Sequence, residues 1–379
     1  MSGKRSIFEE VGQDTPQPEA PKGGMIDQGR RGARGAIRVW LMVLFALVVI
    51  MIAVGGLTRL TDSGLSITEW KPVTGALPPM SAEAWDVEFE KYRAIPEYQL
   101  QNKGMTLEAF KTIYWWEWGH RQLGRVIGLV WAIGFFGFLA VRQIPVGWTG
   151  RLALLGVLGG AQGAIGWWMV SSGLTGVMLD VASYRLATHL GLAFVILGFI
   201  AWYIMMLGRE ERELMQARRA REAKLFGLST GWLHFVFLQI LIGALVAGID
   251  AGRTFTDWPL MGGSLIPEDF WMAELGLRNL FENPGFVQFS HRVIGYLLLG
   301  FAVMVWIKGR RSANRETQFA FHLAFIALIA QVLLGIITVM YVAPWNLAIM
   351  HQLLAVILWV LILRARFLSQ YPQAQSVRG

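Results

Sequence analysis

The stretch Val39–Leu57, VWLMVLFALVVIMIAVGGL, decides the fold class of this chain. It carries no charged residue, and as a helix it is about long enough to cross a bilayer, which takes roughly 20 apolar residues. Seven further apolar stretches follow, at 120–141, 152–170, 188–207, 229–249, 290–307, 319–341 and 346–363. We therefore predict an all-α integral membrane protein with eight transmembrane helices.

The composition agrees with a membrane protein and excludes several kinds of chemistry. Of the 379 residues, 54% are hydrophobic and only 16% are charged, which is too apolar for a soluble protein of this size. There is no cysteine, so disulfides, thiolate nucleophiles and cysteine-ligated metal centres are excluded. Residues 1–38 are polar and basic, and the long apolar run after them has no clean cleavage site, so we expect no signal peptide.

The net charge of +8 is distributed by loop. The N-terminal tail, the turn at 142–151 and the loops at 208–224 and 308–318 are basic, whereas 58–118 and 250–289 are not. By the positive-inside rule the basic segments lie in the cytoplasm. We predict a multi-pass inner-membrane protein, in contact with lipid, with both termini cytoplasmic. The charge sets orientation and does not indicate nucleic-acid binding.

Two halves of the chain repeat one another. HRQLG at 120–124 resembles HRVIG at 291–295, and AQ at 161–162 with Gly166 resembles AQ at 330–331 with Gly335. Four helices in each half give both the same orientation, so we predict two parallel-repeat four-helix bundles. The predicted divisions are a cytoplasmic tail (1–37), the N-terminal half (38–207), a cytoplasmic linker (208–228), the C-terminal half (229–363) and a cytoplasmic tail (364–379).

Gln162, Gln331 and Gln239 each precede a glycine by four residues. Small residues let membrane helices approach closely, and a glutamine can bond across them. We interpret these positions as helix packing.

Four histidines stand at corresponding places in the predicted helices. His120, His189, His291 and His351 open the second, fourth, sixth and eighth helices, all of which run inward from the outer face. Ionisable residues inside a membrane mark functional sites, and two imidazoles on facing helices of a bundle can hold a metalloporphyrin. We predict two heme sites, one in each half, with heme iron bound by His120 and His189 and by His291 and His351. Zinc is disfavoured because no close-spaced ligand motif is present.

Charged residues flank these histidines. Arg121, Arg125 and Arg292 are candidates for pairing with heme propionates, although ordinary snorkelling arginines would look the same. Glu117 lies three residues before His120 and so shares its helix face, and its counterpart in the second half is the neutral Gln288. This difference favours acid–base work at the first site over a simple helix-start glutamate.

Several motifs resemble the heme A synthase family. They are GGLTRLTDSGLS at 55–66 with EWKP at 69–72, EWGHR at 117–121, TH at 188–189, SHR at 290–292 and MHQ at 350–352. The resemblance covers about Ile37 to Leu363 and is closest to the cysteine-free form of proteobacteria and mitochondria.

The resemblance implies that the C8 methyl of heme O is oxidised to a formyl group, through successive hydroxylations, to give heme A for terminal oxidases. It implies that His291 and His351 ligate a resident heme b, that His120 and His189 bind the substrate heme, and that Glu117 is the catalytic acid–base group. It also implies contact with the heme O synthase and an electron donor of unassigned identity. The tryptophan-rich loop 58–118 would cap the first site.

Two other classes of function remain open from the residues alone. One is a b-type cytochrome electron carrier, a quinol-linked membrane subunit with two permanent hemes, and the other is a heme transporter or chaperone. The contrast between Glu117 and Gln288 favours the enzyme over both.

Overall fold

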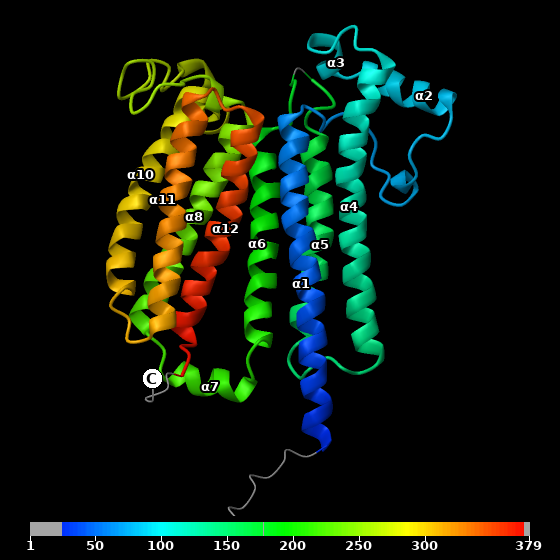
Figure 1. The fold of residues 1–379 in the computed structure, drawn as a ribbon. Coiled ribbons are helices and arrows are strands. Elements are labelled where there is room, and N and C mark those ends of the chain that lie inside the picture. The colour runs from blue at the N-terminus through cyan, green and yellow to red at the C-terminus, as the bar shows by residue number, and fades with distance from the viewer. Residues whose placement is uncertain (1–24, 177, 375–379) are drawn as a thin grey trace, which may run out of the picture.

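The chain folds into a set of long, roughly parallel helices, as Figure 1 shows. The computed structural model describes residues 25–176 and 178–374. The long helices are α1 (Met25–Leu60), α4 (Leu107–Ala140), α5 (Thr149–Val170), α6 (Ser183–Leu207), α8 (Ala223–Gly248), α10 (Pro284–Gly309), α11 (Arg315–Met340) and α12 (Trp345–Gln370). All 8 are long and apolar enough to cross a membrane, in α1 over Ala33–Leu60. The prediction of an all-α protein with eight spans is confirmed.

Shorter helices lie at the two ends of this set. They are α2 (Ala82–Arg93), α3 (Pro96–Leu100), α7 (Glu211–Arg219) and α9 (Asn279–Glu282), with 3-10 turns η1 (Thr74–Ala76), η2 (Ala251–Arg253) and η3 (Ala273–Arg278). Helices α2 and α3 lie at the end where α4 begins, and α7 lies at the opposite end (Figure 1). We call these the loop end and the α7 end.

Helices α4 and α10 begin earlier than the apolar runs indicated. Thr106 caps α4 by accepting from the backbone N–H of Ala109, and Asn283 caps α10 by accepting from Phe286, with a proline at the first turn of that helix. The prediction that the four histidines open their helices is therefore wrong: His120 lies 13 residues after the first residue of α4, His291 seven after that of α10, and His189 and His351 six after those of α6 and α12. The first turns of α4 and α10 are too polar and aromatic to read as a membrane span.

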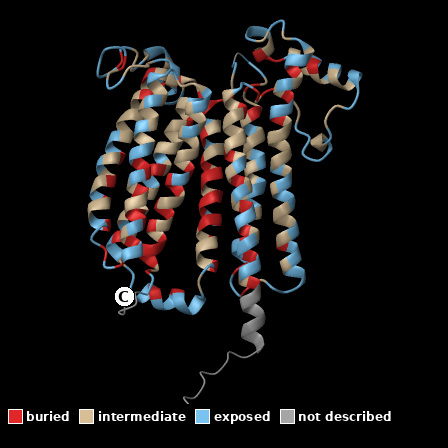
Figure 2. Cartoon of the chain, viewed as in Figure 1, coloured by how far each residue is buried: buried red, intermediate tan, exposed pale blue. Residues whose placement is uncertain are grey.

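The long helices pack in two rings of four. Helix α1 packs on α4, α4 on α5, α5 on α6 and α6 on α1; likewise α8 packs on α10, α10 on α11, α11 on α12 and α12 on α8. Contacts of α6 with α8 and α12, and of α1 with α12, join the rings. Helix α6 is accordingly buried along most of its length, as Figure 2 shows. That the rings are sequence repeats of one another stays a prediction.

A second apolar cluster fixes the loop end above the first ring. It contains Leu65, Phe89, Tyr92, Ile95, Phe110, Tyr114, Val170 and Val181. These residues come from the loop after α1, from α2 and its C-terminal side, from the start of α4, and from the end of α5 and the loop after it. Each of these aromatic side chains buries a large apolar area, and this burial stabilises the packing of segment 61–106 against the membrane helices.

The predicted divisions of the chain stay predictions. Helix α1 begins inside the predicted tail 1–37, of which residues 1–24 lie outside the described part. Helices α7 and the start of α8 lie in the predicted linker 208–228. Helix α12 continues beyond residue 363 into the predicted tail 364–379, whose last residues, 375–379, also lie outside the described part.

Candidate heme-binding site

Each of the four histidines lies against a glycine of the neighbouring helix. A Cβ built on Gly55 of α1 would lie 3.3 Å from Nε2 of His120 on α4. The corresponding distances to a ring Cε1 atom are 2.8 Å from Gly166 to His189, 3.0 Å from Gly243 to His291 and 2.9 Å from Gly335 to His351. Any larger residue at these glycines would collide with or crowd an imidazole.

Glutamines hold three of the four histidines from the neighbouring helix. Gln162 donates its Nε2 to the backbone carbonyl of His189 at 3.0 Å, and Gln331 donates to that of His351 at 3.0 Å. Gln239 donates to that of His291 at 2.9 Å. The same amide nitrogens lie 3.1 to 3.4 Å from ring nitrogens of their histidines. From the sequence we interpreted these glutamines as packing residues that bond across helices. In the structure each makes such a bond, and its acceptor is the backbone carbonyl of a histidine.

The four histidines lie on two pairs of helices, one pair in each ring, and the two helices of a pair stand opposite each other in their ring. Within the first ring α4 and α6 are separated by α1 on one side and α5 on the other, and within the second ring α10 and α12 are separated by α8 and α11. All four histidine helices run from the loop end toward the α7 end (Figure 1). Among the described residues, no group of three or more His, Cys, Asp and Glu could hold a bare metal ion. Paired imidazoles from opposite helices instead suit a flat porphyrin whose iron takes two axial ligands.

The donor set fits that group. Each imidazole packs directly on a glycine of the neighbouring helix, where a Cβ would be 2.8 to 3.3 Å from a ring atom, and Nδ1 of His189 is buried without a hydrogen-bond partner in the described structure. Buried polar atoms without partners are rare in native proteins and often mark the place of a ligand. These residues could therefore hold hemes.

Glu117 is buried in α4, not at its start. The residue is only 2% exposed. One oxygen accepts from the hydroxyl of Ser66 and the backbone N–H of Ile67, both at 2.7 Å, and the other accepts from Arg121 at 2.6 and 3.0 Å. The carboxylate thus links α4, the helix that carries His120, to the loop that follows α1.

The three arginines predicted beside the hemes hold loops in this structure. Arg121 also donates to the carbonyls of Ile67 and Glu69, and Arg125 donates to those of Lys71 and Pro72. In the second ring Arg292 donates to the carbonyls of Phe255, Asp257 and Leu260, and Gln288 shares the carbonyl of Phe255. Their role in propionate binding stays a prediction.

The remaining two histidines make local contacts away from these pairs. Nδ1 of His234 lies 2.8 Å from the carbonyl of Thr230, one turn earlier in α8, and Trp306 donates to Nδ1 of His322 at 2.9 Å. These contacts support the interpretation of both as structural residues.

The structure also brings in residues that the sequence reading did not single out for the site. Gly55 of the GGLTRL motif forms the cradle of His120, and Met51, four residues earlier, lies against the same helix: a Cβ at Gly124 would be 3.5 Å from its Cε. The available signal was the four-residue spacing from Met51 to Gly55, which matches the Gln-to-Gly spacing on the three other cradles.

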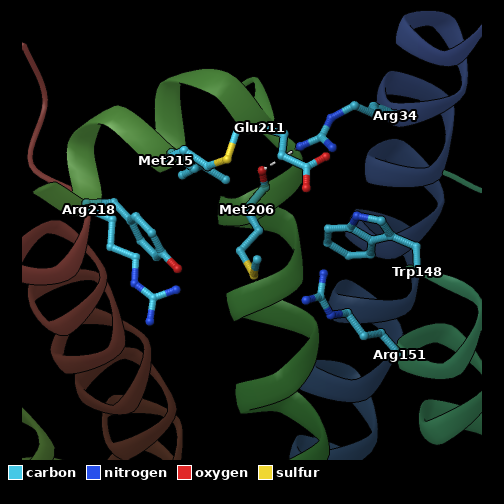
Figure 3. A pocket seen from close by; sticks show the side chains of 9 residues that line it. Arg34, Trp148, Arg151, Met206, Glu211, Met215 and Arg218 are labelled. Atoms are coloured by element: carbon cyan, nitrogen blue, oxygen red, sulfur yellow. Dashed lines mark hydrogen bonds between the residues drawn. The ribbon is translucent and has the colours of Figure 1, made fainter. Parts of the chain in front are cut away.

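A pocket at the α7 end is separate from this site. It has a volume of about 170 Å³, is shown in Figure 3, and is lined by Arg34, Trp148, Arg151, Met206, Glu211, Leu214, Met215, Arg218 and Tyr371. None of these residues is a histidine. Arg34 donates to the carbonyl of Met206, in the last turn of α6, and to that of Arg209, two residues after its end, and so fixes α1 to the C-terminal end of that helix.

Comparisons with known proteins cover the whole described bundle. Residues 38–363 match the family model described as cytochrome oxidase assembly protein. The chain is 70% identical over 377 residues, 99% of each chain, to a protein of Ruegeria sp. (strain TM1040) named heme A synthase. It is 68% identical to the heme A synthase of Ruegeria pomeroyi over 100% of both chains, and 62% identical to that of Paracoccus denitrificans over 99% of both.

Proposed function

This chain belongs to the family of cytochrome oxidase assembly proteins that includes the heme A synthases, and from that membership we propose that it oxidises the C8 methyl of heme O to the formyl group of heme A. Full-length identity to several heme A synthases carries the proposal. The two pairs of histidines, each packed on glycines, would provide a place for a substrate heme and a place for a resident one, and their packing supports the proposal.

We assign the first pair to the substrate and the second to the cofactor. His120 and His189 would hold heme O, and His291 and His351 would be the axial ligands of heme b. Bound hemes supply the electron transfer and oxidising power that side chains lack. The glycines and glutamines of the neighbouring helices would orient the imidazoles. The apolar side chains of the surrounding helices would keep water out.

Glu117 is proposed to move protons at the first site. It lies one helical turn before His120, and the matching position before His291 is Gln288, whose amide cannot exchange a proton in this way. Its buried carboxylate is held at both oxygens, so its position relative to His120 is fixed. A positioned carboxylate of this kind can accept a proton from a hydroxyl group on the oxidised methyl carbon and return it when water leaves.

The test is the heme content of cells that carry Glu117→Gln. We expect heme O to bind and heme A to fall on the order of 100-fold, because general acid–base groups commonly contribute that much. The singly hydroxylated alcohol should accumulate. Ser66→Ala is the matched control, since it removes one bond to Glu117 but keeps the carboxylate, and a smaller loss is expected. Normal heme A production by Glu117→Gln would overturn the assignment of Glu117.

We further propose an inner-membrane location with the α7 end in the cytoplasm. The supporting observation is that the basic loops 208–224 and 308–318 lie at this end of the bundle. Alkaline phosphatase fused at residue 85 should be active and at residue 215 inactive. The reverse pattern would contradict this orientation.

A further inference from the structure

All four histidines pack on a glycine of the neighbouring helix, and three of them also contact a glutamine four residues before that glycine, whereas His120 does not. In each case the histidine lies on a glycine, and the residue four positions before that glycine extends toward the histidine helix. That residue is Gln162, Gln239 or Gln331 for three histidines, and each donates to the backbone carbonyl of its histidine. For His120 it is Met51.

Met51 occupies the same place as a glutamine does in the second ring. Its Cε lies 3.5 Å from a Cβ built on Gly124, four residues after His120. The amide nitrogen of Gln239 lies 3.3 Å from a Cβ built on Gly295, four residues after His291. The two side chains have similar length and fill the same gap between a pair of helices, but only the glutamine ends in a donor.

The exchange of an amide for a thioether leaves His120 without polar support. A thioether sulfur is at most a weak acceptor and donates nothing. Among the described residues, no side chain donates to the carbonyl of His120 or bonds to its ring, whereas its partner His189 has Gln162. Polar contacts around a metal-bound histidine hold it in place, and losing such an outer contact typically costs 10- to 100-fold in metal affinity. Here the contact is the amide N–H that the glutamine donates to the backbone carbonyl of the histidine, which holds the helical turn that carries the imidazole.

We propose that Met51 makes His120 the releasable ligand of the first pair, so that heme there is held firmly by His189 and loosely by His120. This inference rests on the proposed function, in which the first pair binds a heme that must enter as substrate and leave as product. The glutamine-supported pair, His291 and His351, then holds its heme permanently. Met51 is thus a positioning residue for exchange and takes no part in proton transfer.

The experiment compares heme loss from purified full-length variants. Met51→Gln and Met51→Leu are made in a His351→Ala background, so that the remaining bis-histidine heme is the one at the first pair. Each protein is mixed with excess apomyoglobin, and heme transfer is followed by absorbance. We expect Met51→Gln to lose heme more slowly than Met51→Leu, on the order of 10- to 100-fold. The leucine variant is the matched control because it changes the side chain without adding an amide.

A converse pair of variants tests the same idea in the second ring. Gln239→Met, in a His120→Ala background, should release heme faster than the protein with Gln239, by a similar factor. Equal loss rates for Met51→Gln and Met51→Leu, or an unaffected rate in Gln239→Met, would overturn the inference and leave the proposed function intact. If a variant with both His120→Ala and His189→Ala, loaded with excess heme, binds as much heme as the wild-type protein, no heme depends on the first pair, and it is the proposed function that fails.

Discussion

Gln352 on α12 donates its Nε2 to the backbone carbonyl of Ile52 on α1, over 2.8 Å. Gln352 follows His351, and Ile52 follows Met51, so the bond joins the two histidine sites across the contact between the rings. Gly56 makes room for it, because a Cβ there would overlap the Gln352 amide. Adjacent glycines therefore contact different sites: Gly55 faces His120 and Gly56 faces Gln352.

The first prediction concerns Gly56→Ala. The added methyl group must displace the Gln352 side chain, so its bond to Ile52 is lost. We expect a loss of about 1 kcal/mol or more in unfolding free energy, measured by thermal unfolding in detergent. Gly300→Ala is the control, since a Cβ there has nothing within 4 Å. Wild-type stability in Gly56→Ala would show that the two rings do not depend on this bond.

The second prediction concerns the resident heme. His291→Ala or His351→Ala should abolish the low-spin b-type spectrum, because each removes a proposed axial ligand. Gly335→Ala should weaken the same spectrum, since its methyl group would lie 2.9 Å from Cε1 of His351. Optical and electron paramagnetic resonance spectra of purified protein provide the measurement. A normal low-spin signal in both histidine variants would refute the ligand assignment.

The third prediction concerns Arg59, which ties three segments together at the loop end. Its guanidinium lies 3.0 Å from Asp62, 3.0 Å from Asp250 and 3.4 Å from Asp180. The arginine side chain is only 14% exposed, whereas the aspartates are 40 to 48% exposed. Because its partners are half in solvent, we expect Arg59→Gln to cost about 1 to 2 kcal/mol, less than a fully buried pair would.

Salt provides the check on that prediction. The difference in melting temperature between Arg59→Gln and the wild type should shrink as ionic strength rises, because solvent screens exposed charges. Arg93→Gln is the matched control, since Arg93 pairs with Glu90 on the surface, with side chains 42% and 66% exposed. It should cost well under 1 kcal/mol. An equal loss of unfolding free energy in the two variants would show that Arg59 does not hold these segments together.

The fourth prediction concerns pH and Glu97, a buried residue of α3. Burial raises the pKa of its carboxyl from 4.5 to about 8, and the carboxyl accepts from Tyr92 and Asn102. The folded state thus binds this proton more tightly than the unfolded state. The stability it contributes is full below about pH 4.5 and is lost progressively as pH rises to about 8.

Glu97→Gln should remove that dependence. Relative to wild type, the variant should gain stability as pH rises from about 4.5 to about 8, by a few kcal/mol at most, and the difference should then level off. Melting temperatures measured across this range provide the data. Glu90→Gln, at an exposed glutamate of α2, is the control. Parallel pH profiles for wild type and Glu97→Gln would show that Glu97 does not hold its proton in the fold.

The sequence predicted the eight spans because a membrane imposes a single strong requirement, about 20 apolar residues in a row. It misplaced the starts of α4 and α10 because their first turns, at 107–119 and 284–289, carry polar and aromatic residues. A hydropathy pattern ends where the apolar run ends, whereas the backbone hydrogen bonds continue to the caps at Thr106 and Asn283.

The site was predicted only in part, for a different reason. The pairing of the histidines was predicted from their matching positions in the two halves, whereas the Gln-to-Gly positions were interpreted as helix packing, and their contacts with three of the histidines were not predicted. Met51 and Gly55 were not singled out because a methionine in an apolar run resembles any other core residue, and only its four-residue spacing from Gly55 set it apart. The loop carbonyls bound by Arg121 and Arg292 escaped as well, because backbone acceptors are the same in every sequence and only folding decides which of them meet a side chain.

The contact between Gly56 and Gln352 joins the first and the last membrane helix of the chain, which are made at different times. Synthesis in sequence order makes α1 first and α12 last, so Gln352, the side chain that fills the notch over Gly56, is made after all the other membrane helices. The earliest-made helix is thus completed by the latest-made one. A chain cut short anywhere before α12 keeps that notch open on α1, directly beside the glycine that supports His120.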